Sequence, residues 1–154
     1  QPYDERISGS ILTYADMATA QGLREIAVYA DGVGPEKYHY LIPQNERGEL
    51  KLENTSDFVT LAHAAGLLVH PYTFRAENEF LPNLFQTSAD PAALGSAAKE
   101  LDLFLQLGID GFFTDHTDIG VAVRDRYVRN RWVLLILYLS YINLSTEPLS
   151  SFVY

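Results

Sequence analysis

Polar side chains follow two apolar runs of the chain at the points where predicted strands end. Tyr72 lies near the end of the first run, Leu67 to Thr73, and Arg75 comes two residues after that run. Asp115 directly follows the second run, Asp110 to Thr114. In parallel α/β sheets and barrels the carboxyl ends of the strands form the functional face. The arginine fork can bind a phosphate in bidentate fashion. Tyr72, Arg75 and Asp115 are therefore the candidate substrate-binding residues.

Each of these residues also has a purely structural interpretation. Asp115 or Asp118 could cap the helix that follows, and spacing alone favours that role for Asp115. Arg75 could be an ordinary solvated charge. Glu77 and Asn78 open a long loop that could close over a ligand or simply be a solvated acidic segment.

The histidines do not form a recognisable catalytic or metal-binding pattern. The chain has four of them and no cysteine, and no HExxH motif or pair at i, i+4 is present. His70 in its apolar run reads as a core residue, and His63 near a helix end reads as a cation at the helix dipole. No GxSxG elbow and no phosphate-binding loop occurs. The sequence thus predicts no metal site and no nucleophile in this chain.

The elements that would position the candidates repeat three times as a helix followed by a strand. The helix expected over 19–29, capped by Thr19, precedes a short strand near Val33. The other expected elements are a helix from Ser56-Asp57 to Gly66 before strand 67–73, a helix carrying Ala97, Leu101, Phe104 and Leu105 before strand 110–114, and a short final helix over 118–126. Helical crossovers predict three parallel neighbouring strands in chain order, with an open edge beside the first. Residues 1–14 read as a loop, and the alternation of Tyr38, Tyr40 and Ile42 predicts an extended stretch.

Length and charge limit the possible functions. The 154 residues are fewer than the roughly 250 of a complete (β/α)8 barrel. The formal net charge of −9 argues against nucleic acid as a partner. Residues 1–125 hold 8 basic and 19 acidic side chains, whereas residues 126–154 hold 3 and 1. The chain therefore divides near Arg126 into an acidic part, 1–125, and an apolar tail, 126–154.

The tail contains the run WVLLILYLSYINL at 132–144, for which three interpretations are open. It could be a buried strand or core helix, which is the favoured interpretation. It could be a read-through or frame-altered end without a native role. Membrane association through 132–144 is disfavoured, because its 13 residues fall short of the roughly 20 that a spanning helix needs.

The amino-acid sequence of the acidic part resembles the glycerophosphodiester phosphodiesterase family, in its periplasmic or secreted branch. The matching segments run from about Tyr3 to Asp125 and comprise QPYD at 1–4, YAD at 14–16, YADGVGP at 29–35, HPYTFRAENEFLP at 70–82 and GIDGFFTD at 108–115. The resemblance implies a TIM (β/α)8 barrel of the phospholipase-C-like phosphodiesterase type. This chain would supply its C-terminal section of about three βα units. Strand six would end at Gly34-Pro35, and strands seven and eight would be His70 to Arg75 and Gly111 to Asp115.

The resemblance also implies an activity, together with a missing part. Such enzymes hydrolyse glycerophosphodiesters to glycerol 3-phosphate and an alcohol, using a divalent cation, Ca²⁺ or Mg²⁺, and a pair of histidines. The family's His-Arg-Gly motif, second histidine and metal-binding carboxylates all precede strand six. We therefore expect the catalytic residues upstream of Gln1, in an N-terminal half of the barrel, and an inactive isolated chain. Tyr72, Arg75 and Asp115 remain as substrate-side residues. The alternative is a truncated or diverged barrel remnant that is inactive or acts as an interaction module.

Overall fold

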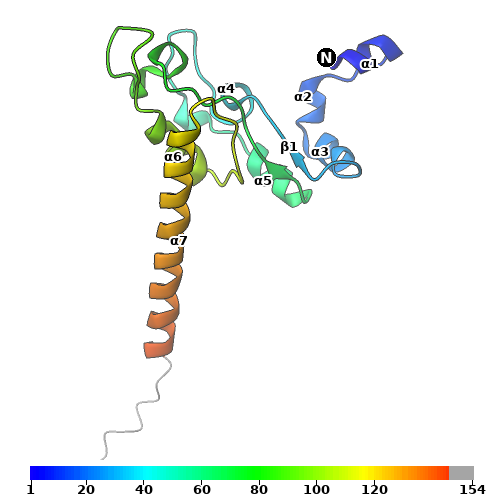
Figure 1. Cartoon of the computed structure of the whole chain (residues 1–154). Helices are drawn as coiled ribbons and strands as arrows, with labels where there is room; N and C mark the ends of the chain where they lie inside the picture. Colours follow the sequence, from blue (N-terminus) through cyan, green and yellow to red (C-terminus); the bar gives the residue numbers. More distant parts are fainter. Residues whose placement is uncertain (146–154) are drawn as a thin grey trace, which may run out of the picture.

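The computed structural model describes residues 1–145, with side chains to Leu139, and shows a small parallel sheet together with several helices (Figure 1). Strand β1, Gly32–Val33, pairs in parallel with β2, Leu68–Val69. The parallel arrangement continues beyond both strands through bridges of Glu36 to Tyr72 and of Phe74 to Thr114. The expected order of three parallel neighbours is thus confirmed. Within the described residues β1 has a strand partner on one side only, as expected.

The strands are much shorter than predicted. Strand 67–73 is reduced to two regular residues, and strand 110–114 to a single bridge supported by a hydrogen bond from the Phe113 amide to the Pro71 carbonyl (3.0 Å). Prolines explain part of the difference, because Pro35 and Pro71 have no N–H to donate to a ladder. The chain keeps its parallel course at these places without regular strand geometry.

Helices make up most of the remaining ordered structure. They are α1 (Tyr3–Ser8), α2 (Tyr14–Met17), α3 (Ala20–Ile26), α4 (Lys37–Tyr40), α5 (Phe58–Ala64), α6 (Ala97–Gln106) and α7 (Thr117–Ser145), with 3-10 turns η1 (Leu52–Asn54), η2 (Asn78–Phe80) and η3 (Asn83–Phe85). The Thr19 side chain caps α3 as predicted, accepting a hydrogen bond from the Gly22 amide. The loop predicted for 1–14 is wrong, because α1 lies within it. The extended stretch predicted around Tyr38 is also wrong, because Glu36 caps the short helix α4 there.

The hydrophobic core lies between one face of the sheet and the helices. Its buried members come from α3, α5, α6, α7 and the strand segments, and include Leu23, Phe58, Val69, Phe74, Phe104 and Val123. The alternate positions Leu68 and Tyr72 are about half exposed, at 49% and 44%. Since successive strand residues point to opposite faces, the second face of the sheet is uncovered in the described chain. An uncovered inner face is what a section of a barrel would present.

An ion pair joins α5 to the segment that follows α6, at the amino-terminal side of the strands. His63 Nε2 lies 2.8 Å from Asp110 Oδ2, which also accepts a hydrogen bond from the Val69 amide at 2.8 Å. Burial pushes the pKa of Asp110 upward, but these hydrogen bonds and the nearby positive charge outweigh it and hold the pKa below its ordinary value. His63 therefore has a specific partner in addition to its place near a helix end.

The final helix differs most from expectation. Instead of a short helix over 118–126, α7 continues for 29 residues without interruption through Arg126. No proline or glycine occurs between Val121 and Ser145 to end it. The side chains of 132–139 are exposed, so the interpretation of the tail as a buried strand or core helix is wrong for these residues. Positions 140–144 of that run lie outside the residues with described side chains. Within the described chain, no helix is both long and apolar enough to cross a membrane.

Candidate functional site

Arg75 and Asp115 are brought together where the second and third strand segments end. Arg75 Nε lies 3.2 Å from Asp115 Oδ2, an ion-pair distance without hydrogen-bond alignment. Arg75 Nη2 donates to Glu77 Oε1 at 2.9 Å. The guanidinium carbon lies 3.8 Å from the centre of the Phe80 ring, in a cation–π contact. Arg75 is therefore held in one orientation by two carboxylates and an aromatic ring.

Glu77 is the stronger partner of this arginine. Its pKa is held below the ordinary value by a hydrogen bond from its own amide, which outweighs the effect of burial, and by the hydrogen bond and charge of Arg75. Glu77 is consequently ionised at neutral pH. With Asp115 it places two negative charges beside one positive charge. The guanidinium therefore presents its N–H donors in a fixed direction, while the two carboxylates offset its positive charge.

Tyr72 occupies the neighbouring strand end and presents its ring to solvent. A side chain added at Gly34 would meet its ring at 4.0 Å and the Phe113 ring at 3.8 Å, so the two aromatics share one side of this glycine. Tyr72 is 44% and Phe113 56% exposed. The two rings form an accessible aromatic surface on the uncovered face of the sheet. Phe113 was not among the predicted site residues, although it stands two positions before Asp115.

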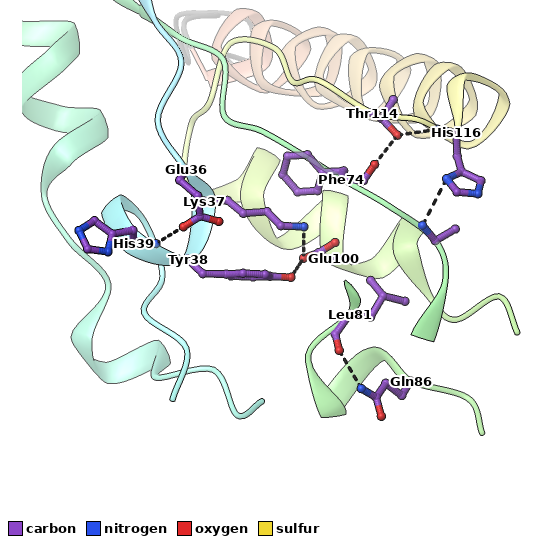
Figure 2. A network of polar contacts seen from close by, with 11 residues as sticks. Glu36, Lys37, Tyr38, His39, Phe74, Leu81, Gln86, Glu100, Thr114 and His116 are labelled. Atoms are coloured by element: carbon purple, nitrogen blue, oxygen red, sulfur yellow. Dashed lines mark hydrogen bonds and ion pairs between the residues drawn. The ribbon is translucent and has the colours of Figure 1, made fainter. Parts of the chain in front are cut away.

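Thr114 and His116 tie the two strand ends to each other (Figure 2). The Thr114 hydroxyl donates to the Phe74 carbonyl (2.9 Å) and accepts from the His116 amide (3.1 Å). His116 Nδ1 accepts a hydrogen bond from the Ala76 amide at 3.3 Å. These three hydrogen bonds set the positions of the residues on either side of Arg75 and Asp115.

A buried ionic network links α4 to α6 close to the candidate site (Figure 2). Lys37 Nζ lies 2.8 Å from Glu100 Oε1, and the Tyr38 hydroxyl donates to the same oxygen. Lys37 is 2% exposed and Glu100 fully buried. Burial lowers the pKa of Lys37 and raises those of Glu100 and Tyr38, while the attraction between lysine and carboxylate opposes both shifts within the pair.

Lys37 connects this network to the strand ends. Its ammonium lies 4.3 Å from the centre of the Phe74 ring, and its amide donates to the Tyr72 carbonyl at 3.2 Å. The sequence analysis missed the network. A signal was available, because Glu100 interrupts the apolar stripe of α6 between Ala97 and Phe104, on the face turned to the core.

The described residues do not contain a metal-binding cluster. No group of three or more histidine, aspartate or glutamate side chains among them could hold an ion. The two carboxylates nearest each other at the strand ends are both occupied by Arg75. A divalent cation therefore does not fit the residues described here.

A large cavity lies along α7 and reaches the end of the third strand segment at Thr114. It measures about 1030 Å³ and is lined by His70, by 108–112 and by helix residues from Gly120 to Tyr138. The residues that line this cavity do not include Tyr72, Arg75 or Asp115.

Comparisons with known proteins identify the family of the chain. Residues 8–119 match the model of the Glycerophosphoryl diester phosphodiesterase family. The chain belongs to this family, whose fold is of the TIM-barrel type.

Two named relatives support the assignment. The chain is 39% identical over 106 residues to glycerophosphodiester phosphodiesterase GDPD6 of Arabidopsis thaliana, an alignment that covers 68% of this chain and 25% of the relative. It is 32% identical over 121 residues to glycerophosphodiester phosphodiesterase of Treponema pallidum (strain Nichols), covering 79% of this chain and 31% of the relative. The chain thus matches about a quarter to a third of the length of these relatives.

Proposed function

We propose that this chain is the substrate-side, C-terminal section of a glycerophosphodiester phosphodiesterase barrel. The enzyme would hydrolyse glycerophosphodiesters to glycerol 3-phosphate and an alcohol. The observation that carries the proposal is the meeting of Arg75 and Asp115 at the carboxyl ends of adjacent parallel segments, within the family match. By the resemblance, the compartment would be the periplasm or the exterior of the cell.

The side chains of the described residues indicate which catalytic groups we expect in another part of the barrel. Phosphodiester hydrolysis in this family's manner needs carboxylates around a cation and a histidine near the leaving oxygen. The described residues offer no such cluster. We therefore place the catalytic histidines and the Ca²⁺ or Mg²⁺ ligands in a preceding half of the barrel. That half would also cover the open edge of β1 and the uncovered face of the sheet.

The role of each site residue follows from its surroundings. The Tyr72 ring, which is exposed, would contact the glycerol or head-group carbons of the substrate. Arg75, fixed by Glu77 and Asp115, would donate its remaining N–H groups to a phosphate oxygen. Because the two carboxylates offset its charge, Arg75 would act mainly through the direction of its hydrogen bonds. Asp115 would hold the guanidinium in place.

A reconstitution experiment tests the proposal. The part of the Treponema pallidum relative that precedes the matched region is joined to Gln1, and release of glycerol 3-phosphate from glycerophosphocholine is measured with Ca²⁺ or Mg²⁺. We expect turnover by the folded chimera and none by either part alone. Absence of turnover by a cooperatively folded chimera would favour the inactive remnant. Cation-dependent turnover by the 154-residue chain alone would show that the catalytic residues were misplaced.

A further inference from the structure

The distal part of α7 extends beyond the end of α6. At about 1.5 Å per residue the 29-residue helix is about 43 Å long. Its first part packs on α6, with Val123 buried, Arg126 paired with Asp102, and the Tyr127 hydroxyl donating to the Leu105 carbonyl at 2.9 Å. From Val128 to Leu139 every side chain is exposed, and Figure 1 shows this part extending beyond all other described elements.

The exposed surface is apolar on every side of the helix. Trp132, Val133, Leu134 and Leu135 are 60%, 50%, 66% and 45% exposed. Successive residues of an α-helix are about 100° apart, so these four positions cover the whole circumference. A helix that docks in a protein groove needs only one apolar stripe. A lipid environment, in contrast, contacts all sides at once.

Helix α7 continues past the end of its neighbour α6. Tyr127 contacts Leu105, in the last turn of α6, so α7 passes the end of the neighbouring helix at this level. Residues 132–139 therefore lie beyond the end of α6, the described helix on which the first part of α7 packs.

The border of the apolar segment has the composition of a membrane interface. Arg129 and Arg131 lie within the three residues before Trp132, and the Arg131 guanidinium lies 5.7 Å from the centre of the Tyr127 ring. Tryptophan and tyrosine are enriched at the lipid–water boundary, and arginine is attracted to anionic head groups. No acidic residue occurs in the sequence between Asp125 and Glu147, in contrast to the acidic body of the protein.

We propose that the distal part of α7 is a monotopic anchor, which inserts its apolar surface into one leaflet of an anionic lipid bilayer. Arg129 and Arg131 would lie at the head groups and Trp132 at the boundary. The apolar run 132–144 is about 20 Å long as a helix, shorter than the roughly 30 Å hydrocarbon core, so the anchor enters the bilayer without crossing it. Because α7 starts beside Asp115 and runs away from the strand carboxyl ends, the candidate site would remain open to water.

The fluorescence of Trp132 tests the proposal on the full chain. It is the sole tryptophan of the sequence, so its emission reports directly on the segment. Vesicles of phosphatidylcholine alone and with about 30% phosphatidylglycerol are compared by emission and by flotation. We expect a blue shift and co-flotation with the anionic vesicles, both weakened by high salt.

Matched double variants separate lipid contact from general surface effects. Leu134→Glu with Leu137→Glu should lower the partition coefficient by at least about tenfold, because charges disfavour insertion. Val28→Glu with Leu84→Glu changes two apolar residues elsewhere that are at least as exposed and should leave the partition coefficient within about twofold. Arg129→Gln with Arg131→Gln should lower the affinity for anionic vesicles about tenfold, because each head-group contact is lost. Since all six side chains are exposed, far-UV circular dichroism should be unchanged.

Three results would overturn the proposal. The first is the absence of vesicle binding by the unchanged chain. The second is equal binding by the Leu134→Glu, Leu137→Glu variant. The third is a blue shift that grows with protein concentration without vesicles and disappears in that variant, which would assign the surface to pairing between copies of the chain.

Discussion

Lys37 and Glu100 lie 63 positions apart in the sequence, and their side chains form a buried ion pair of 2.8 Å between α4 and α6. The pair joins the segment after β1 to the helix that precedes the third strand segment. Since the Lys37 amide also binds the Tyr72 carbonyl, this contact couples the core to the candidate site.

Breaking this pair from one side should be costly. Lys37→Met leaves the Glu100 carboxylate buried without its cation, and we expect the free energy of unfolding to fall by about 3–5 kcal/mol. Urea denaturation of the full chain measures it. Lys51→Met is the control, because Lys51 and Glu49 form an exposed pair at 4.0 Å, worth about 0–1 kcal/mol. Equal effects of the two changes would refute a stabilising role for the buried network.

Replacing both partners should cost less than the two single changes together. In the Lys37→Met, Glu100→Leu double variant no uncompensated charge remains, and apolar replacements of similar volume are often tolerated. A double-mutant cycle by urea denaturation should give a coupling of about 1–3 kcal/mol. Simple additivity of the two changes would show that the side chains act independently.

The contribution of Asp110 should depend on pH in a defined direction. Its pKa is depressed in the folded chain, so the stabilisation is present above the pKa of the unfolded chain and is lost as the pH falls through the folded value. Asp110→Asn should therefore be less stable than the unchanged chain by about 1 kcal/mol at neutral pH, and the difference should shrink below about pH 4. Unfolding curves across pH measure it, with Asp125→Asn as an exposed control. A difference that grew on acidification would contradict the assigned sign.

Gly22 offers a test of the packing between α2 and α3. Alanine has the higher helix propensity, by about 1 kcal/mol, and by that criterion Gly22→Ala would stabilise α3. A Cβ at Gly22 would, however, lie 2.4 Å from the Asp16 carbonyl oxygen and 2.6 Å from the Met17 Cα, both backbone atoms. We expect a net loss of about 1–3 kcal/mol in thermal or urea unfolding. A gain in stability would show that the two helices are farther apart.

The hydroxyl of Thr114 should matter for the site more than for folding. Thr114→Val keeps the shape but removes the donor to the Phe74 carbonyl and the acceptor for the His116 amide. In the reconstituted enzyme we expect KM to rise about tenfold, because the strand ends that hold Arg75 and Asp115 separate. Thr114→Ser retains the hydroxyl and should stay within about twofold of the unchanged enzyme. Identical kinetics for the two variants would exclude this role.

Local sequence rules predicted the features that depend on neighbouring residues. The Thr19 cap and the parallel order of three segments follow from capping and crossover rules, and both are confirmed. The sequence placed Arg75 and Asp115 at strand ends but did not predict their contact, which arises because the ends of adjacent parallel segments lie at one edge. Glu77 and Phe80 were not expected as partners of Arg75, since their positions depend on the course of a long loop.

Other features depend on contacts that no local pattern reports. Predicting the Lys37–Glu100 pair requires knowing that α4 and α6 are neighbours. The position of Glu100 within an apolar stripe did indicate a buried charge. Regular strands failed to form at Pro35 and Pro71, where the apolar pattern persists but the hydrogen-bond donor is missing. For the tail, hydrophobicity alone predicted burial, whereas the helix extends past the element that would have covered it.

The kinetics of Arg75 variants test the central claim, that this chain binds the substrate while the reactive groups lie elsewhere in the barrel. In the reconstituted enzyme, Arg75→Ala should raise KM about tenfold and leave kcat within about twofold, and Arg75→Lys should recover little, because lysine lacks the fork. Arg47→Ala, at an exposed turn, is the matched control and should change neither constant. A fall in kcat of about a thousandfold with unchanged KM would contradict the account, because it would place Arg75 in the chemical step itself.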